Sequence, residues 1–221
     1  EKTRQHLLDL LASLPRNDFR PEQGALWTNV HIDDSINYDD IKPGQRLPFR
    51  QANDLQNNRI QEWVGEKITG MGRDKAILEL FCGSGNFTEP LSRHGFNNIL
   101  GVDMSSDAVD TLRMKDLPGV RCLVANLYEK QAYGRIGKEM KTPEVMLFDP
   151  PRDGLKRRKE ILSLASKSSD IFYISCDPAT FVRDVRDFVV LGFEPGEVQP
   201  LDMFPHTPHV EILAHLQKAK S

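Results

Sequence analysis

From residue 76 onward, short apolar runs alternate with longer segments whose apolar residues recur at helical spacing. The short runs predict strands, because each is only a few residues long and strongly apolar. The predicted strands are Ala76–Phe81, Asn98–Asp103, Val120–Val124, Val145–Asp149 and Ile171–Ser175. Their apolar residues do not alternate strictly, which is typical of parallel strands covered by helices on both faces. The pattern therefore predicts an α/β fold with a mostly parallel sheet.

The carboxyl-terminal segment has a different pattern. Glu197–Phe204 and Val210–Gln217 are close neighbours in the sequence, and they predict an antiparallel hairpin. A parallel sheet closed by such a hairpin is the layout of class I S-adenosylmethionine-dependent methyltransferases, whose Rossmann-like sheet has seven strands. This is the fold class that we expect.

The first part of the chain follows neither pattern. Residues 1–48 predict a small amino-terminal appendage, with a helix over Thr3–Leu14 and a strand over Ala25–Ile32. Residues 49–221 form the predicted catalytic domain, which begins with a helix over Gln51–Gly70. The buried stripe expected of this helix consists of Leu55, Ile60, Trp63, Val64 and Ile68.

Composition is that of an ordinary globular protein, with 39% hydrophobic and 28% charged residues. No stretch approaches the roughly 20 apolar residues that a membrane span needs, and the amino end lacks a secretory pattern. Cys82, Cys122 and Cys176 lack the paired spacing of a metal site or a disulfide framework. We therefore expect a cytoplasmic monomer with no membrane association and no bound metal.

A glycine-rich turn over Leu80–Thr88 follows the first predicted strand. Gly83 and Gly85 allow the backbone to turn tightly and to approach a ligand, at the sheet edge where α/β proteins bind nucleotides. A tight strand–helix connection without a ligand is the alternative. Asp103 ends the next strand, about 20 residues on, where an acid can bind ribose hydroxyls. Asp107 is a rival acid, which we expect to face solvent.

Asn126 follows the third predicted strand, where an adenine contact is commonly supplied. A turn-forming asparagine is the alternative interpretation. Asp149-Pro150-Pro151-Arg152 closes the fourth strand with two prolines, which make the loop rigid and remove backbone donors. Such a loop suits holding a flat substrate beside a cofactor. Arg152 favours a phosphate or a carbonyl partner over an amino-group target.

Cys176 follows the last parallel strand and precedes Pro178. A buried cysteine is usually a small hydrophobe. A thiolate at this sheet edge, however, suits the methylation of carbon 5 of a pyrimidine, which is a poor nucleophile. Addition of sulfur at carbon 6 makes carbon 5 enolate-like, so that it can accept a methyl group from a sulfonium donor. A base must then remove the proton from carbon 5 so that the cysteine can leave.

The tail supplies a candidate for this base. Glu211 stands alone among apolar residues, so we expect it to be semi-buried with a raised pKa. An edge-strand carboxylate that faces water is the alternative. His206 and His209 are interpreted as structural hydrogen-bonding groups or RNA contacts rather than as acid–base groups.

Together these segments resemble the RNA uracil-5-methyltransferase family, which makes 5-methyluridine in transfer RNA and ribosomal RNA. Six motifs carry the resemblance, in family order from about residue 49 to the end. They are Phe49-x-Gln51-x-Asn53, the turn Leu80–Thr88, Asn126, Asp149-Pro150-Pro151-Arg152-x-Gly154, Ser175-Cys176-x-Pro178-Ala179-Thr180 and Asp202-Met203-Phe204-Pro205-His206-Thr207-x-His209-x-Glu211.

The resemblance implies S-adenosyl-L-methionine as cofactor and an RNA substrate, with Cys176 as nucleophile and Glu211 as base. The implied cofactor contacts are Gln51, Phe81, Gly83, Asn86, Asp103, Asn126 and Asp149, and the implied substrate contacts are Asp149 and Arg152. Asp177 replaces the usual asparagine of the family, and we expect its carboxylate to raise the pKa of the neighbouring thiol. Asp103 stands where glutamate is common.

Family members commonly carry an upstream oligonucleotide-binding barrel, and many carry cysteines for an iron–sulfur cluster. Neither is visible in this sequence, so no iron–sulfur cluster is expected. The net charge of −3 gives no global attraction to RNA. RNA contacts must then come from residues 1–48, from a segment outside this sequence, or from Lys156–Lys159, for which a solvated helix face is the alternative. An amino-group methyltransferase and a non-catalytic RNA-binding module are the other functions considered.

Overall fold

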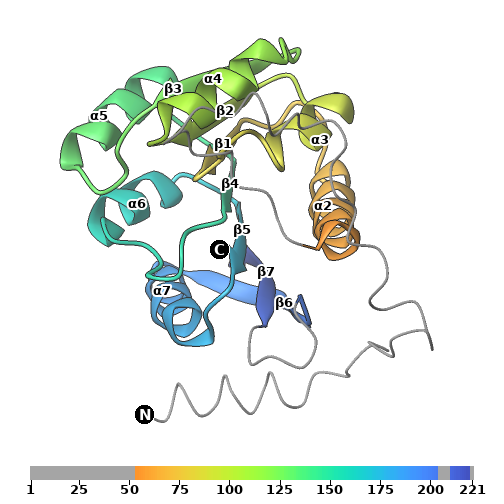
Figure 1. Ribbon diagram of the computed structural model, residues 1–221. Helices are drawn as coiled ribbons and strands as arrows, with labels where there is room; N and C mark the ends of the chain where they lie inside the picture. Colours follow the sequence, from red (N-terminus) through yellow and green to blue (C-terminus); the bar gives the residue numbers. More distant parts are fainter. Residues whose placement is uncertain (1–52, 204–209, 220–221) are drawn as a thin grey trace, which may run out of the picture.

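The computed structural model describes residues 53–203 and 210–219. Within these ranges the protein forms a seven-stranded sheet in the order β3-β2-β1-β4-β5-β7-β6 (Figure 1). The strands are β1 Ile77–Leu80, β2 Ile99–Asp103, β3 Val120–Val124, β4 Val145–Phe148, β5 Asp170–Ser175, β6 Phe193–Leu201 and β7 Glu211–Lys218. This is the class I methyltransferase fold, as the sequence predicts.

The sheet is parallel through its first five strands and antiparallel at its carboxyl-terminal end. Strand β7 lies between β5 and β6 and pairs antiparallel with both. The predicted hairpin is therefore confirmed, and only β6 and β3 lie at the edges of the sheet. The strand order reverses between β1 and β4, and α/β folds of this kind bind ligands beyond the carboxyl ends of the strands at such a point.

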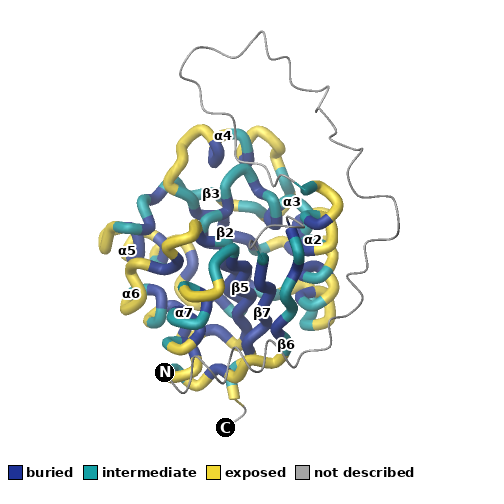
Figure 2. Tube along the Cα trace, turned by 60° about the horizontal axis from the view of Figure 1, so that its bottom comes forward, coloured by how far each residue is buried: buried dark blue, intermediate teal, exposed yellow. Residues whose placement is uncertain are grey.

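Six helices of the described ranges cover the sheet. They are α2 Asp54–Thr69, α3 Thr88–Arg93, α4 Ser106–Met114, α5 Lys130–Glu139, α6 Arg158–Ala165 and α7 Pro178–Val190. Figure 1 shows α5, α6 and α7 on one side of the sheet, with α2 and α3 on the other. Each side has its own apolar core, because one set of strand residues packs on α5–α7 and the alternate set packs on α2 and α3. The strands β5 and β7 are buried along the middle of the molecule (Figure 2).

Helix α2 packs through a narrower stripe than the sequence predicts. Gln56, Ile60, Val64 and Ile68 recur every four residues and are buried. Leu55, which we expected in this stripe, is 65% exposed. The prediction for Leu55 is wrong because Gln56 takes the inward position of the first turn, where its side-chain amide donates to the backbone oxygen of Asp202 at 3.1 Å.

The predictions for residues 1–48, including their separation as an appendage, lie outside the described residues and stay predictions. Among the helices that are described, none is both long enough and apolar enough to cross a membrane.

Candidate active site

Four parallel strands deliver the candidate site residues to one edge of the sheet. The glycine turn follows β1, Asp103 ends β2, Asp149 follows β4 and Cys176 follows β5. These strands are neighbours in the order β2-β1-β4-β5, so their carboxyl ends lie side by side. The sheet topology thus brings together residues that are up to about 95 positions apart in the sequence.

The turn after β1 is built from left-handed backbone conformations. Phe81, Gly83 and Gly85 have φ values of 67°, 54° and 96°. A Cβ atom on Gly85 would lie 2.5 Å from Leu112 Cδ1, so this glycine allows α4 to pack closely on the turn. A Cβ on Gly83 would meet no protein atom within 4 Å, so the turn is open to a ligand at that residue. Phe81 is half-buried and packs against the core that α5–α7 cover.

The carboxylate of Asp103 is fixed by the backbone. One oxygen accepts from the N–H of Gly83 at 3.0 Å and the other accepts from the N–H of Ser105 at 2.8 Å. Each carboxylate oxygen can accept a second hydrogen bond, so Asp103 is oriented and still able to bind hydroxyl groups. Asp107, in the first turn of α4, is exposed, which confirms the expectation that it faces solvent.

Asn86 is engaged with α2. Its side-chain amide exchanges two hydrogen bonds of 2.9 Å with the amide of Asn57. Gln61 donates to both the side-chain oxygen and the backbone oxygen of Asn86, at 2.8 and 2.7 Å. Asn86 therefore holds α2 against the glycine turn, and the cofactor contact expected of it stays a prediction.

Asn126 lies in the turn that follows β3. Its side-chain oxygen accepts from the N–H of Tyr128 at 3.0 Å, and its amide donates to Glu129 at 3.0 Å. This is the turn-forming role that the sequence leaves open. The residue is half-buried at the predicted edge of the sheet, and its contact with adenine stays a prediction.

Glu211 lies opposite the cysteine loop. The antiparallel ladder of β5 and β7 pairs Ser175 with Ile212, and the next positions along it are Cys176 and Glu211. Glu211 is only 6% exposed, and burial raises its pKa to about 7, against the opposing effect of the Arg152 guanidinium. The expected burial and raised pKa are confirmed. The water-facing alternative is wrong, because β7 is an interior strand.

Asp149 and Cys176 share this environment. Burial raises the pKa of Asp149 to about 7, and the nearby charge of Glu211 adds to the effect. Burial also raises the pKa of the Cys176 thiol, as do Glu211 and Asp149, whereas Arg152 lowers it. These effects indicate that the nucleophile, the base and the acidic loop of the sequence prediction are electrostatic neighbours.

Asp177 does not act on the thiol as we expected. The pKa of Cys176 is raised by burial, Glu211 and Asp149 rather than by the adjacent carboxylate. Asp177 is instead the N-cap of α7, and its side chain accepts from the N–H of Thr180 at 2.7 Å. Aspartate and asparagine are about equally good N-caps, so the departure from the family pattern preserves this function.

The basic run Lys156–Lys159 lies between the acidic loop and the first turn of α6, and all four residues are exposed. Lys156 pairs with Asp153 at 2.9 Å, and Arg158 pairs with Asp187 at 2.9 Å. Exposed pairs of this kind are weak, and a phosphate group can replace the carboxylate partner. These features agree with both interpretations of the run, an RNA contact and a solvated surface.

Three buried acids were missed by the sequence analysis, namely Glu79, Asp170 and Asp184. Asp170 begins β5, at the end of the strand away from Cys176. Glu79, in the middle of β1, accepts a 2.5 Å hydrogen bond from Thr88 Oγ1, and burial raises its pKa to about 8. Asp184, in α7, is 1% exposed and accepts hydrogen bonds from Tyr173, Leu155 and Arg183. A lone acid within the apolar run Ile77–Leu80 was a readable signal for Glu79, whereas no local pattern distinguished Asp184 from its neighbours.

Gln51, His206 and His209 lie outside the described residues. Within residues 53–203 and 210–219, no group of three or more histidine, cysteine, aspartate or glutamate side chains is arranged to hold a metal ion.

Comparison with known proteins gives one matching family model, described as tRNA (uracil-5-)-methyltransferase. It matches residues 30–116 and 130–219. The match therefore includes the glycine turn, the acidic loop, Cys176 and Glu211.

Two curated relatives illustrate the similarity. An uncharacterized RNA methyltransferase of Nitrosomonas europaea is 38% identical over 215 residues, which cover 97% of this chain and 55% of the relative. The 23S rRNA (uracil(1939)-C(5))-methyltransferase RlmD of Hahella chejuensis is 35% identical over 184 residues, which cover 78% of this chain and 40% of the relative. The chain thus spans about half the length of such relatives, or less.

Solved structures show the same fold. The tRNA (uracil-54, C5)-methyltransferase of Pyrococcus abyssi, in complex with S-adenosyl-L-homocysteine, has a TM-score of 0.61 and 31% identity, and the match covers 76% of this chain and 40% of that chain. The magnesium protoporphyrin IX methyltransferase of Synechocystis, with bound SAM, has a TM-score of 0.56 at 14% identity, and the match covers 80% of this chain and 87% of that chain. At that identity the second likeness concerns the fold alone.

Proposed function

Because the chain belongs to the tRNA (uracil-5-)-methyltransferase family, we propose that it transfers a methyl group from S-adenosyl-L-methionine to carbon 5 of a uridine in transfer RNA or ribosomal RNA. The observation that carries the proposal is the convergence of Asp149, Cys176 and Glu211 at one edge of the sheet, beyond the neighbouring strands β4, β5 and β7. The relative from Hahella is named for a uracil of 23S rRNA and the one from Pyrococcus for a uracil of tRNA, so both RNA classes are candidates.

The edge of the sheet fits S-adenosylmethionine. The open side of Gly83 leaves room for the ligand beside the turn, and the fixed carboxylate of Asp103 can accept hydrogen bonds from ribose hydroxyls. The further cofactor contacts that we propose are Gln51, Phe81, Asn86, Asn126 and Asp149. When bound, the cofactor supplies an electrophilic methyl group on a sulfonium centre, which an activated carbon 5 can accept.

Cys176 supplies the activation of carbon 5. Its thiolate adds to carbon 6 of the uracil ring, a carbon–sulfur bond forms, and the electrons of the former double bond make carbon 5 nucleophilic. The thiol is half-buried with a raised pKa, so a minority of it is ionised in the free enzyme at neutral pH. The guanidinium of Arg152 opposes that shift, and we assign to it both the stabilisation of the thiolate and a contact with the substrate.

Glu211 completes the reaction. It removes the proton from carbon 5, the double bond to carbon 6 forms again, and Cys176 leaves as a thiolate. A pKa of about 7 suits this task, because such a carboxylate is basic enough to take a proton and is still partly ionised at neutral pH. Asp149, in the rigid proline loop, is proposed to hold the uracil beside the cofactor.

The uridine must leave the RNA base stack to reach this site. Lys156 and Lys159 are exposed beside the acidic loop, and we propose that they contact phosphates near the target base.

The experiment is methylation of RNA from cells that lack the protein, followed by nucleoside mass spectrometry for 5-methyluridine. Cys176→Ala should abolish the product while calorimetry still detects S-adenosylmethionine binding. Cys122→Ala, in β3, is the matched control and should retain activity. Formation of 5-methyluridine by Cys176→Ala at the wild-type rate would overturn the covalent mechanism. An N-methylated nucleoside in place of 5-methyluridine, formed equally by Cys176→Ala, would support an amino-group methyltransferase instead. Cofactor binding by the wild-type protein without any turnover would support a non-catalytic module.

A further inference from the structure

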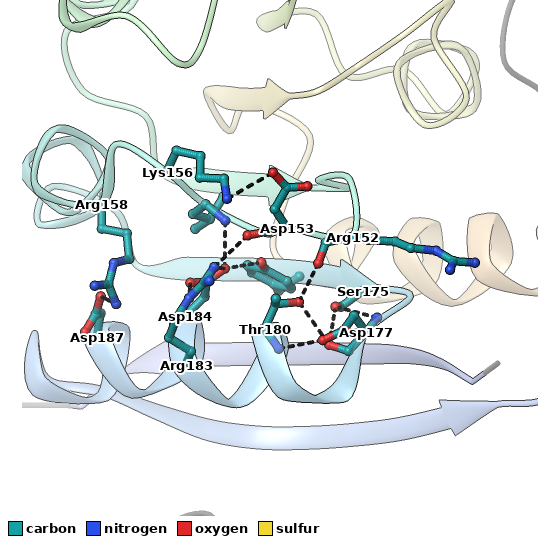
Figure 3. A network of polar contacts seen from close by, with 12 residues as sticks. Arg152, Asp153, Lys156, Arg158, Ser175, Asp177, Thr180, Arg183, Asp184 and Asp187 are labelled. Carbon is teal, nitrogen blue, oxygen red and sulfur yellow. Dashed lines mark hydrogen bonds and ion pairs between the residues drawn. The ribbon is translucent and has the colours of Figure 1, made fainter. Parts of the chain in front are cut away.

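A buried carboxylate of α7 binds the loop that carries Asp149 and Arg152 (Figure 3). Asp184 lies on the inner side of α7 and is 1% exposed. Its side chain accepts from the N–H of Leu155 at 2.8 Å and from the hydroxyl of Tyr173 at 2.8 Å. Arg183 donates to it from Nε at 2.8 Å and from Nη2 at 3.1 Å. A carboxylate with this many donors is held in one orientation.

On one side, these contacts determine the path of the loop. Arg183 Nη2 also donates to the backbone oxygen of Asp153 at 2.9 Å, so the pair Arg183 and Asp184 binds the backbone on both sides of Gly154. Gly154 has a φ of 65°, and a Cβ atom there would lie 2.3 Å from Asp184 Oδ2. The loop can approach the carboxylate this closely only because residue 154 is glycine.

On the other side, the same carboxylate reaches the strand and the helix that flank the nucleophile. Tyr173 is in β5, three positions before Cys176, and α7 begins at Pro178, two positions after it. A second link is formed by Thr180, whose hydroxyl donates to the backbone oxygen of Arg152 at 3.1 Å. In Figure 3 the side chain of Arg152 extends away from this network, so the contacts hold its backbone and leave the guanidinium free to reach the site.

We propose that Asp184 is a positioning residue, which fixes the loop of Asp149 and Arg152 relative to Cys176. Asp184 contacts none of these three residues directly, so it acts through the position of the loop. Its effect on catalysis rests on the proposed function. Covalent catalysis needs the nucleophile and the substrate-holding loop in one geometry, and a displacement of about 1 Å can lower the rate about 100-fold.

Two substitutions disturb the contact between the Asp184 carboxylate and the loop, one on the helix and one on the loop. Asp184→Asn keeps the shape of the side chain but replaces an acceptor oxygen by an amide that faces the N–H groups of Leu155 and Arg183. Gly154→Ala leaves Asp184 intact and pushes the loop away from it. Asp187→Asn is the matched control, because Asp187 is on the same helix and pairs with Arg158 at the surface. Tyr173→Phe removes only the hydroxyl that donates to Asp184, and it replaces Asp184→Asn in the test if that variant does not fold.

The first readout is steady-state methylation. Asp184→Asn and Gly154→Ala should each lower kcat about 10-fold to 100-fold, with the KM for RNA and the Kd for S-adenosylmethionine within about threefold of the wild type. The double variant should be no more than about threefold slower than the slower single variant, because both changes break the same contact. Asp187→Asn should retain the wild-type kcat.

The second readout does not depend on methylation. The rate of Cys176 alkylation by iodoacetamide at pH 8, followed by peptide mass spectrometry in the free protein, reports the surroundings of the thiol. The groups that face it are Glu211, Arg152 and Asp149. Displacement of the loop moves both Arg152, which lowers the pKa of the thiol, and Asp149, which raises it. The alkylation rate should therefore differ from that of the wild type by at least about threefold in both variants and be unchanged in Asp187→Asn.

Wild-type kcat in Asp184→Asn and Gly154→Ala overturns the positioning role. A wild-type protein that methylates no uridine overturns the proposed function instead. In that case the alkylation rate of Cys176 still tests the positioning role. Equal rates in the wild type, Asp184→Asn and Gly154→Ala would show that Asp184 does not position the loop.

Discussion

At the scale of single residues, the chemistry of the site depends on carboxyl groups that burial keeps partly protonated. Asp149 and Glu211 each have a pKa raised to about 7, and the charge of Glu211 contributes to the shift of Asp149. Ionisation of Glu211 therefore opposes ionisation of Asp149. Glu211 is partly protonated before the substrate binds, so it can lie close to Cys176 without strongly repelling the thiolate.

Glu211→Gln should trap the enzyme on its RNA. The amide cannot remove the proton from carbon 5, so the methylated uridine should remain bonded to Cys176. We expect a band of lower mobility on a denaturing gel, which nuclease treatment removes. Glu197→Gln is the control, because it is the same substitution at a glutamate on another strand, β6. Glu197 pairs with Lys67 and accepts a hydrogen bond from Trp63. An absence of the slow band, with turnover retained, would reject Glu211 as the base.

At the scale of secondary structure elements, α7 connects the nucleophile to the rest of the site. The helix begins directly after the cysteine loop, with Asp177 as N-cap and Pro178 in the first turn, where its missing N–H is harmless. Ser175 and Asp177 also exchange hydrogen bonds across Cys176, at 3.1 and 3.3 Å. The start of the helix therefore determines the backbone conformation on both sides of the thiol.

Asp177→Ala should destabilise the protein, and Asp177→Asn should not. Loss of an N-cap side chain typically lowers the free energy of unfolding by about 1 kcal/mol, and asparagine caps about as well as aspartate. Urea unfolding at pH 7 measures both changes. Equal stability of Asp177→Ala and the wild type would show that the hydrogen bond to Thr180 contributes little to folding.

At the scale of the whole molecule, packing at the sheet raises the pKa of three acids. Glu79, Asp149 and Glu211 have pKa values of about 8, 7 and 7, each raised mainly by burial. At these three groups the folded state therefore binds more protons than the unfolded state between about pH 4.5 and pH 8. The contribution of these groups to stability is fully present below their unfolded pKa values and is lost as the pH rises through the folded values.

Glu79→Gln should make stability less dependent on pH. Glutamine can still accept the hydrogen bond from Thr88 and has no charge to desolvate. Relative to the wild type, the variant should gain stability as the pH rises from 5 to 8. Urea unfolding at pH 5, 6, 7 and 8 measures the slope, and parallel curves for the two proteins would contradict the raised pKa of Glu79.

Much of the fold could be predicted because its signals are local. Short apolar strands, the glycine turn and the spacing from Gly83 to Asp103 are readable in sequence order, and the sheet places them as expected. The position of Cys176 after a strand also indicated the edge of the sheet at which it lies. Gln51 and the amino-terminal appendage stay predictions, since they lie outside the described residues.

Other features were decided by contacts between distant segments. Leu55 was expected inside, but the inward position of its turn belongs to Gln56, whose side chain donates to the backbone oxygen of Asp202, directly after β6. Asp184 looks like an ordinary polar position of an amphipathic helix, and only the approach of the acidic loop and Tyr173 buries it. Asp177 likewise caps α7 instead of raising the pKa of Cys176, because its side chain points toward the N–H of Thr180.

By itself, the sequence determined the order of strands and helices, the glycine turn and the chemical types of the site residues, because periodicity and turn chemistry act over a few neighbouring positions. Only the tertiary structure decided that β7 inserts between β5 and β6, which makes Glu211 an interior carboxyl group opposite Cys176. Burial, and with it the pKa of an acid, is a property of long-range strand pairing, which no local window of residues contains.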